Sequence, residues 1–110
     1  MKTLKLLFVS ASVLMLSATL VAQPKPLVVP AASSTMKNPV AQSAASTKTG
    51  MDLYTKNCAS CHGKAGLGDG VKARALKTFP GDFYKAEFQG QTDGYHFFKT
   101  KVGRGEMPKY

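Results

Sequence analysis

Two cysteines and a histidine form the most chemically specific part of this 110-residue chain. They occur as Cys58-Ala59-Ser60-Cys61-His62, so the thiols are three positions apart and the imidazole follows directly. This C-x-x-C-H pattern is the attachment signature of a c-type haem. On one helical turn, each thiol can form a thioether with one porphyrin vinyl group, which directs His62 at the iron as an axial ligand. The pattern therefore predicts one covalently bound haem c.

Three other roles for the cysteine pair explain less of the sequence. A structural zinc site normally has four Cys or His ligands, and His96 is the one further candidate here. A thioredoxin-like pair lies beside alternating strands and helices, which this sequence does not show. A disulfide suits an exported protein, but it leaves His62 unexplained.

The surrounding residues resemble those of a class I c-type cytochrome. The segment from Gly50 to Gly63 is similar to the opening of such a domain, and Gly105-Glu106-Met107-Pro108 is similar to its ligand loop. Between them, in the family's order, come Gly68-Asp69-Gly70, then Leu76, then Pro80-Gly81-Asp82-Phe83. The resemblance covers nearly all of residues 50–110. It implies a small all-α domain wrapped around one covalent haem.

The resemblance also implies that Met107 is the second axial ligand of the iron. A soft thioether opposite histidine stabilises reduced iron and raises its potential. Pro108 would stiffen the loop that presents the sulfur. Two alternatives stay open: ligation by His96, or an iron left five-coordinate, which would bind small molecules.

The elements that must position these residues are predicted to be helices. A first helix is expected to be capped by Thr49, because Met51, Tyr54 and Cys58 then follow at helical spacing. A glycine-rich loop comes next, at Gly63, Gly66, Gly68 and Gly70.

Two further helices are predicted after this loop. A short one is expected at residues 71–76, and a longer one should begin at the cap Asp93 and end at Gly103. Class I cytochromes normally add a carboxy-terminal helix that packs across the first helix at positions such as Gly50 and Tyr54. The chain ends at Tyr110 without such a helix.

Composition divides the chain into three parts. Residues 1–22 have a basic start and an apolar run, which predicts a signal peptide cleaved near Ala22. Residues 23–48 are rich in Pro, Ala and Ser and predict a disordered linker. Residues 49–110 form the predicted haem domain. The protein is therefore expected to be exported and periplasmic, with no stable membrane span unless the signal is retained as a tether.

The charge distribution bears on the partners. Of the formal net charge of +9, the predicted signal peptide contributes two lysines and the linker three, which leaves +4 for the haem domain. We expect redox protein partners, docked through a basic rim on acidic surfaces; ordinary solvated lysines are an equal alternative. The lysines concerned are Lys64, Lys72, Lys77 and Lys109. No nucleic-acid partner is expected, because the chain has no recognition motif.

The resemblance implies a function in electron transfer. A monohaem c-type cytochrome shuttles single electrons between redox partners and is not itself an enzyme. Two alternatives remain at this stage. The chain is either a haem domain or subunit of a larger oxidoreductase, or a five-coordinate haem sensor or peroxidase-like protein.

Overall fold

The structure is a computed structural model that describes residues 25–110, so the predicted signal peptide lies outside the described residues. The described part is helical, and its one piece of β pairing is an isolated bridge between Arg104 and Met107. The predicted all-α fold class is confirmed. Within residues 25–110, no helix has the length and apolar character needed to span a bilayer.

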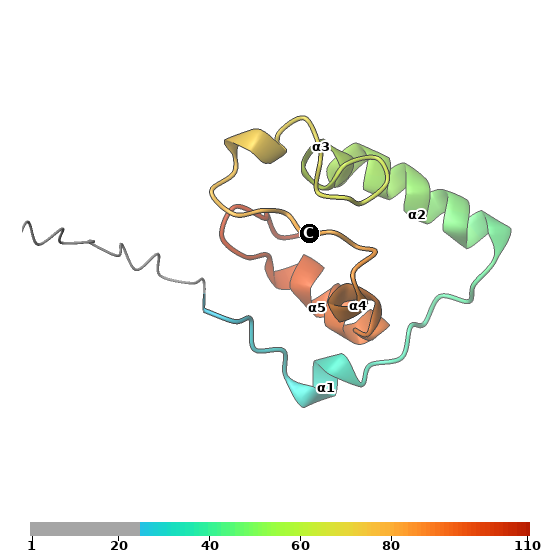
Figure 1. Cartoon of the computed structure of the whole chain (residues 1–110). Coiled ribbons are helices and arrows are strands. Elements are labelled where there is room, and N and C mark those ends of the chain that lie inside the picture. Colours follow the sequence, from blue (N-terminus) through green and yellow to red (C-terminus); the bar gives the residue numbers. More distant parts are fainter. Residues whose placement is uncertain (1–24) are drawn as a thin grey trace, which may run out of the picture.

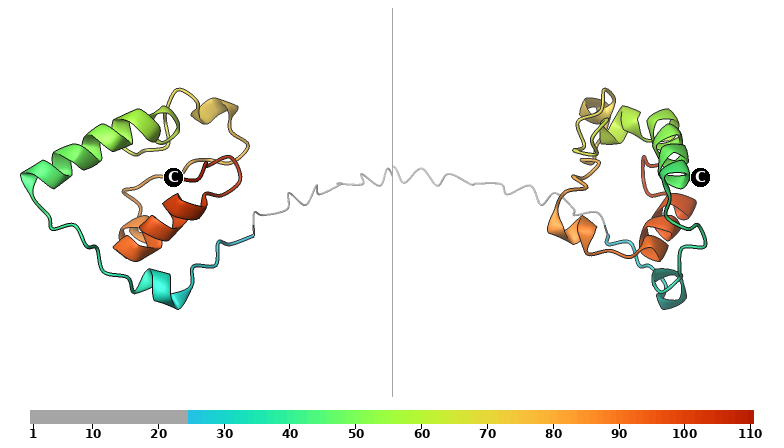
Figure 2. Two further views of the ribbon diagram at one scale, coloured as in Figure 1. Left: turned by 180° about the vertical axis from the view of Figure 1, so that it is seen from behind. Right: turned by 90° about the vertical axis from the view of Figure 1, so that its right-hand side faces the viewer.

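The helices lie on two sides of the domain (Figures 1 and 2). Helices α2 and α3 follow one another on one side, and α4 and α5 lie on the other, with α1 beside α5. In chain order the elements are α1 (Ala31–Ser34), α2 (Ala44–Asn57), α3 (Ala59–His62), the 3-10 helix η1 (Ala73–Ala75), α4 (Ala86–Gln89) and α5 (Asp93–Val102).

Helix α2 begins five residues before the predicted cap. Ser43 is the N-cap: its hydroxyl accepts from the Ser46 backbone N–H at 3.0 Å, while the Ser46 hydroxyl accepts from the Ser43 N–H at 2.9 Å. This reciprocal pair is a capping box, which satisfies two backbone donors that would otherwise lack partners. The prediction that Thr49 caps the helix is therefore wrong.

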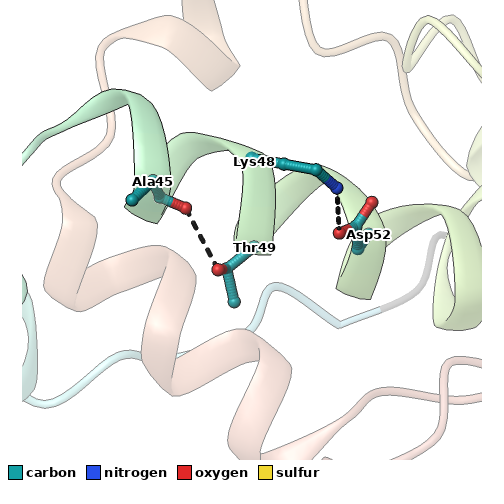
Figure 3. A network of polar contacts seen from close by, with 4 residues as sticks. All are labelled: Ala45, Lys48, Thr49 and Asp52. Atoms are coloured by element: carbon teal, nitrogen blue, oxygen red, sulfur yellow. Dashed lines mark hydrogen bonds and ion pairs between the residues drawn. The ribbon is translucent and has the colours of Figure 1, made fainter.

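Thr49 lies inside α2 instead (Figure 3). Its hydroxyl donates to the Ala45 carbonyl at 3.0 Å, one helical turn earlier. This bond lets a threonine hydroxyl be satisfied inside a helix as well as at a cap. In the same turn, Lys48 forms an ion pair with Asp52 at 2.8 Å. Both charged groups are largely exposed, so this pair contributes little to stability.

The carboxy-terminal elements agree with the prediction in part. Helix α5 covers Asp93–Val102 and ends at Gly103 as expected, but its N-cap is Thr92, whose hydroxyl accepts from the Tyr95 N–H at 3.2 Å. The helix predicted at residues 71–76 is shorter, because only Ala73–Ala75 form one 3-10 turn. Helix α4 was not predicted.

Apolar side chains do not form a core of their own in the described part of the chain. None of the apolar side chains in residues 25–110 is fully buried. Several aromatic residues are half-buried, and the buried residues among the described ones are glycines. A domain of about 60 residues usually needs a cofactor, metal or disulfide to compensate for so small a core.

Residues 34–38 of the predicted linker lie against α5, and its last residues, from Ala44, belong to α2. The Thr92 hydroxyl donates to the Ser34 carbonyl at 2.5 Å, and the Asn38 amide donates to the Asp93 carboxylate at 3.1 Å. Composition predicted a free, extended segment here because it offers almost no apolar surface to bury. These two contacts are single polar ones, one to a backbone carbonyl and one between side chains, which composition does not reveal.

Candidate haem site

The cysteine motif forms a single helical turn. Cys58 joins α2 to α3: its N–H donates to the Tyr54 carbonyl at 2.8 Å, and its own carbonyl accepts from the His62 N–H at 2.9 Å. Both thiols are free and half-buried. The structure therefore brings Cys58, Cys61 and His62 together on one turn, as the spacing predicted.

The backbone N–H groups of the glycine-rich loop donate to the carbonyl groups of this turn. A helix leaves its last four carbonyls without intrahelical partners, and α3 is only four residues long. All four find a donor in residues 63–72. Gly63 N–H donates to Ala59 O at 2.9 Å, Lys72 to Ser60 at 2.8 Å, Gly70 to Cys61 at 3.2 Å and Gly68 to His62 at 2.8 Å. A short helix that would be unstable alone is thus fixed by the loop that follows it.

Gly70 permits the closest approach between loop and helix. A Cβ atom at this position would overlap with the Ser60 carbonyl oxygen and lie 2.7 Å from the Ala59 carbonyl oxygen. Both obstacles are backbone atoms, which cannot rotate away as a flexible side chain can. Gly70 is therefore required by packing against the haem motif.

Tyr54 ties the helix before the motif to the residue after it. Its hydroxyl donates to the carbonyl of Gly63 at 2.6 Å. Burial raises the pKa of the Tyr54 hydroxyl, and Cys58 and Asp69 add to the rise. The group therefore stays a neutral donor, and it closes α2, α3 and the start of the loop into one unit.

His62 has the state and surroundings of a metal ligand. Burial lowers the pKa of its imidazole, and the nearby positive charge of Lys99 lowers it further, which favours the neutral form that binds metals. Its Nδ1 atom is buried and has no hydrogen-bond partner among residues 25–110. Its ring lies 4.9 Å from that of Phe83, between ring centroids.

An aromatic series links the motif to α5. The Phe83 ring stacks on Phe88 with centroids 4.2 Å apart, and Phe88 lies 4.2 Å from the ring of His96. Burial lowers the pKa of His96, with Lys99 adding to the effect, so this imidazole too is held neutral. His96 is half-buried and interior-facing, and it remains an alternative ligand.

Met107 lies in a separate turn just after α5. Its backbone N–H and carbonyl both pair with Arg104, at 2.9 and 3.0 Å, which closes the turn that presents its side chain. The neighbouring Glu106 carboxylate accepts from the Lys77 N–H at 2.7 Å and anchors the turn to the segment after η1. The Met107 side chain is half-buried, and no hydrogen bond within residues 25–110 joins it to the cysteine motif.

The family described as cytochrome c oxidase, cbb3-type, subunit III matches residues 45–110. This match covers more than half of the chain, from the first turn of α2 to the last residue. The chain belongs to this cytochrome c family. A comparison with curated proteins found no match. The resemblance to class I c-type cytochromes is confirmed, and with it a covalently bound haem c containing iron as the cofactor of this cytochrome.

The residues of the cytochrome c domain fit such a group. The turn offers two accessible thiols and a neutral imidazole whose buried Nδ1 lacks a protein partner in the described part of the chain. A buried polar atom left unpaired is costly unless a ligand or a further acceptor uses the site. The half-buried aromatic rings offer flat apolar surface that the protein alone does not cover. A haem would cover this apolar surface, and its iron would bind the neutral imidazole of His62.

Two structural residues of the cytochrome were not recognised from the sequence. Tyr54 was assigned to a contact with a further helix, whereas its hydroxyl holds the Gly63 carbonyl. Its position one turn before Cys58 was the only signal for this role. Glu106 was not assigned any role, and its link to Lys77 depends on a contact across 29 positions that spacing cannot indicate.

Proposed function

We propose that this protein is a monohaem c-type cytochrome that carries single electrons between redox partners outside the cytoplasm. The observation that supports it most directly is the fixed turn α3, which presents two thiols and one neutral imidazole together. Cys58 and Cys61 hold the haem covalently, and His62 is an axial ligand. Export to the periplasm, with or without retention of the amino-terminal segment, belongs to the same proposal.

Met107 completes the proposed ligand set. The bound haem supplies an iron that gains and loses one electron. The chain's own residues hold, orient and shield that group and set its potential, and they catalyse no bond-making step, so the protein is not an enzyme. Support for Met107 comes from its turn, which two backbone hydrogen bonds and the Glu106 anchor hold in place.

A second candidate function is that of a haem subunit in a larger oxidoreductase. The matching family is described as a subunit of cbb3-type cytochrome c oxidase. Helix α2 also exposes two large apolar side chains, Met51 at 65% and Leu53 at 57%. Single exposed apolar side chains are common on protein surfaces, so the family match is the observation that favours this candidate. A holoprotein that purifies as a monomer and exchanges electrons in solution favours the free carrier, whereas stable association with membrane oxidase subunits favours this candidate.

The direct test is an optical spectrum and an intact mass of protein from an exporting host that has haem-attachment machinery. A reversible reduced-minus-oxidised spectrum and the mass of one haem are expected. Thioether-bound haem survives denaturation, so a disulfide or zinc protein would show no porphyrin mass. Mature protein with both thiols free and no colour would refute the proposal.

Replacing Met107 tests the second ligand. The change M107A should lower the midpoint potential by on the order of 0.1 V, within the about 0.8 V range that axial ligands span. It should also allow the reduced protein to bind carbon monoxide at neutral pH. The measurements are redox titration and carbon monoxide difference spectra.

The matched control is M51A, which removes an exposed methionine from α2 and should leave both quantities unchanged. If M107A behaves like M51A, the same measurements on H96Q decide whether His96 is the ligand. Carbon monoxide binding by the unmodified protein would instead indicate a five-coordinate iron and a sensor or peroxidase-like role.

A further inference from the structure

We propose that residues 25–38 form a strap that docks on α5, latched at Gly94 and Arg104, and restrains the turn that carries Met107. The docking itself concerns contacts within the chain. Its effect on Met107 rests on the function proposed above. The strap is part of the segment, residues 23–48, that composition predicts to be a disordered linker.

The main docking point is Gly94, in the first turn of α5. Gly94 is buried, and a Cβ atom there would overlap with the Ser33 carbonyl oxygen of α1. The same atom would lie 3.0 Å from the Met36 carbonyl oxygen and 3.1 Å from the Met36 Cβ. Glycine is intrinsically unfavourable inside a helix, by about 1 kcal/mol relative to alanine. The close approach of the strap gives a structural reason for it here.

Hydrogen bonds also hold the strap at the two residues before Gly94. Thr92, which caps α5, donates its hydroxyl proton to the Ser34 carbonyl, and Asn38 donates to Asp93. A hollow between the strap and α5 is lined by apolar side chains from both, including Met36 and Phe97. The strap therefore contacts three consecutive residues at the start of α5: the cap Thr92, Asp93 and Gly94.

The strap also reaches the other end of α5. The Arg104 guanidinium, just beyond the helix, donates to the Lys25 carbonyl. Between the two latches, Leu27 and Val29 are half-buried whereas Val28 is 79% exposed. This alternation is typical of an extended segment with one face against the protein. The strap thus runs along α5 from its end to its beginning.

Arg104 connects the strap to the proposed ligand. Its side chain holds Lys25, while its backbone forms both hydrogen bonds of the Met107 turn. Movement of α5 or of Arg104 must therefore be transmitted to the turn. A docked strap restrains both ends of α5, so it restrains Met107 without touching it.

The test is the change G94A in the full-length holoprotein. Alanine suits the helical backbone of Gly94, so the haem spectrum should be retained while the clash with Ser33 releases the strap. Trypsin cleavage after Lys37, which lies in the strap, should become about tenfold faster, because cleavage follows the population of the open segment. The control is G50A, also a helical glycine but with open space around its Cβ position, and it should leave this rate unchanged.

Carbon monoxide binding to the reduced protein tests the restraint on Met107. The unmodified reduced protein, with Met107 bound, is expected to resist carbon monoxide at neutral pH. G94A and a deletion of residues 25–38 should both bind it measurably, while G50A should not. An unchanged cleavage rate in G94A overturns the docking. Faster cleavage with unchanged carbon monoxide binding in both variants overturns the restraint. Failure of the proposed function would show separately, as a missing haem spectrum, whatever the cleavage rates.

Discussion

Individual polar groups fix the geometry around the haem motif. Tyr54 is half-buried and donates to the Gly63 carbonyl, which follows His62 directly and is itself on a buried residue. This single bond joins the helix before the motif to the loop after it. His62 in turn is held neutral by burial, which lowers its pKa. The backbone of α3 and its N-cap thus places Cys58, Cys61 and His62, and the Tyr54 hydroxyl stabilises that arrangement.

The change Y54F tests whether the Tyr54–Gly63 hydrogen bond stabilises the motif. It removes one hydrogen bond from the Gly63 carbonyl, which keeps a second donor, the Gly66 N–H at 3.2 Å. The free energy of unfolding should fall by about 1 kcal/mol, the usual net value of one such bond. Urea unfolding of the holoprotein followed by circular dichroism measures it.

Tyr84 supplies the matched control for this measurement. It is 70% exposed, so Y84F should change the free energy of unfolding by less than about 0.5 kcal/mol. Equal values for the two variants would show that the Tyr54 hydroxyl does not stabilise the motif.

At the scale of elements, a four-residue helix is stabilised by the loop that follows it. The loop supplies a donor for every free carbonyl of α3, and Gly70 makes the approach that this requires. Helix α2 depends instead on a local device, the Ser43–Ser46 capping box. Helix α2 is thus fixed by residues next to it in the sequence, and α3 by hydrogen bonds from the loop that follows it.

Two glycine-to-alanine changes should have opposite effects at this scale. G70A places a Cβ against the backbone of Ser60 and should destabilise the protein by about 1–3 kcal/mol, as overpacking does. G50A meets no atom within 4 Å and should stabilise α2 by about 0.5–1 kcal/mol. Thermal unfolding of the two holoproteins gives the comparison. A G70A protein as stable as the parent would contradict the close packing of loop and helix.

At the scale of the whole molecule, we expect the cofactor to complete the core of the described part of the chain. No apolar side chain of residues 25–110 is fully buried, yet the rings of Phe83, just before α4, of Phe88 in α4 and of His96 in α5 form a series that leads to His62. Burial of apolar surface is the main favourable contribution to folding. A haem bound here is therefore expected to stabilise the fold by covering these rings.

This dependence is tested by making the same chain in hosts with and without haem-attachment machinery. The protein without haem should give a weak near-ultraviolet circular dichroism spectrum and no cooperative urea transition, since its side chains lack fixed packing. The protein with haem should show both features. A double variant, C58S/C61S, made in the competent host should resemble the haem-free protein. A cooperative transition in either haem-free sample would show that the chain has a sufficient core of its own.

The sequence alone was sufficient to predict features that depend on neighbouring residues, such as the haem motif and the ends of α5. The haem motif needs only the spacing of Cys58, Cys61 and His62 along one turn, and that spacing is explicit in the chain. The extent of α5 was also predictable, because a polar cap and Gly103 mark its ends within a few residues. The cap of α2 was predicted six residues too late, at Thr49 instead of Ser43, because Ser43 and Ser46 form a capping box that lacks the usual Glu or Gln.

Contacts between residues far apart in the sequence became known only from the tertiary structure. The contact of Gly94 with Ser33 joins residues about 60 positions apart, and the hydrogen bond of Asn38 with Asp93 spans a similar separation. Neither contact leaves a periodic apolar pattern, because both rest on backbone atoms, small residues and single polar groups. Sequence patterns report which surfaces a segment must bury, whereas these contacts depend on which backbone comes close enough to fit, and only the folded chain determines that.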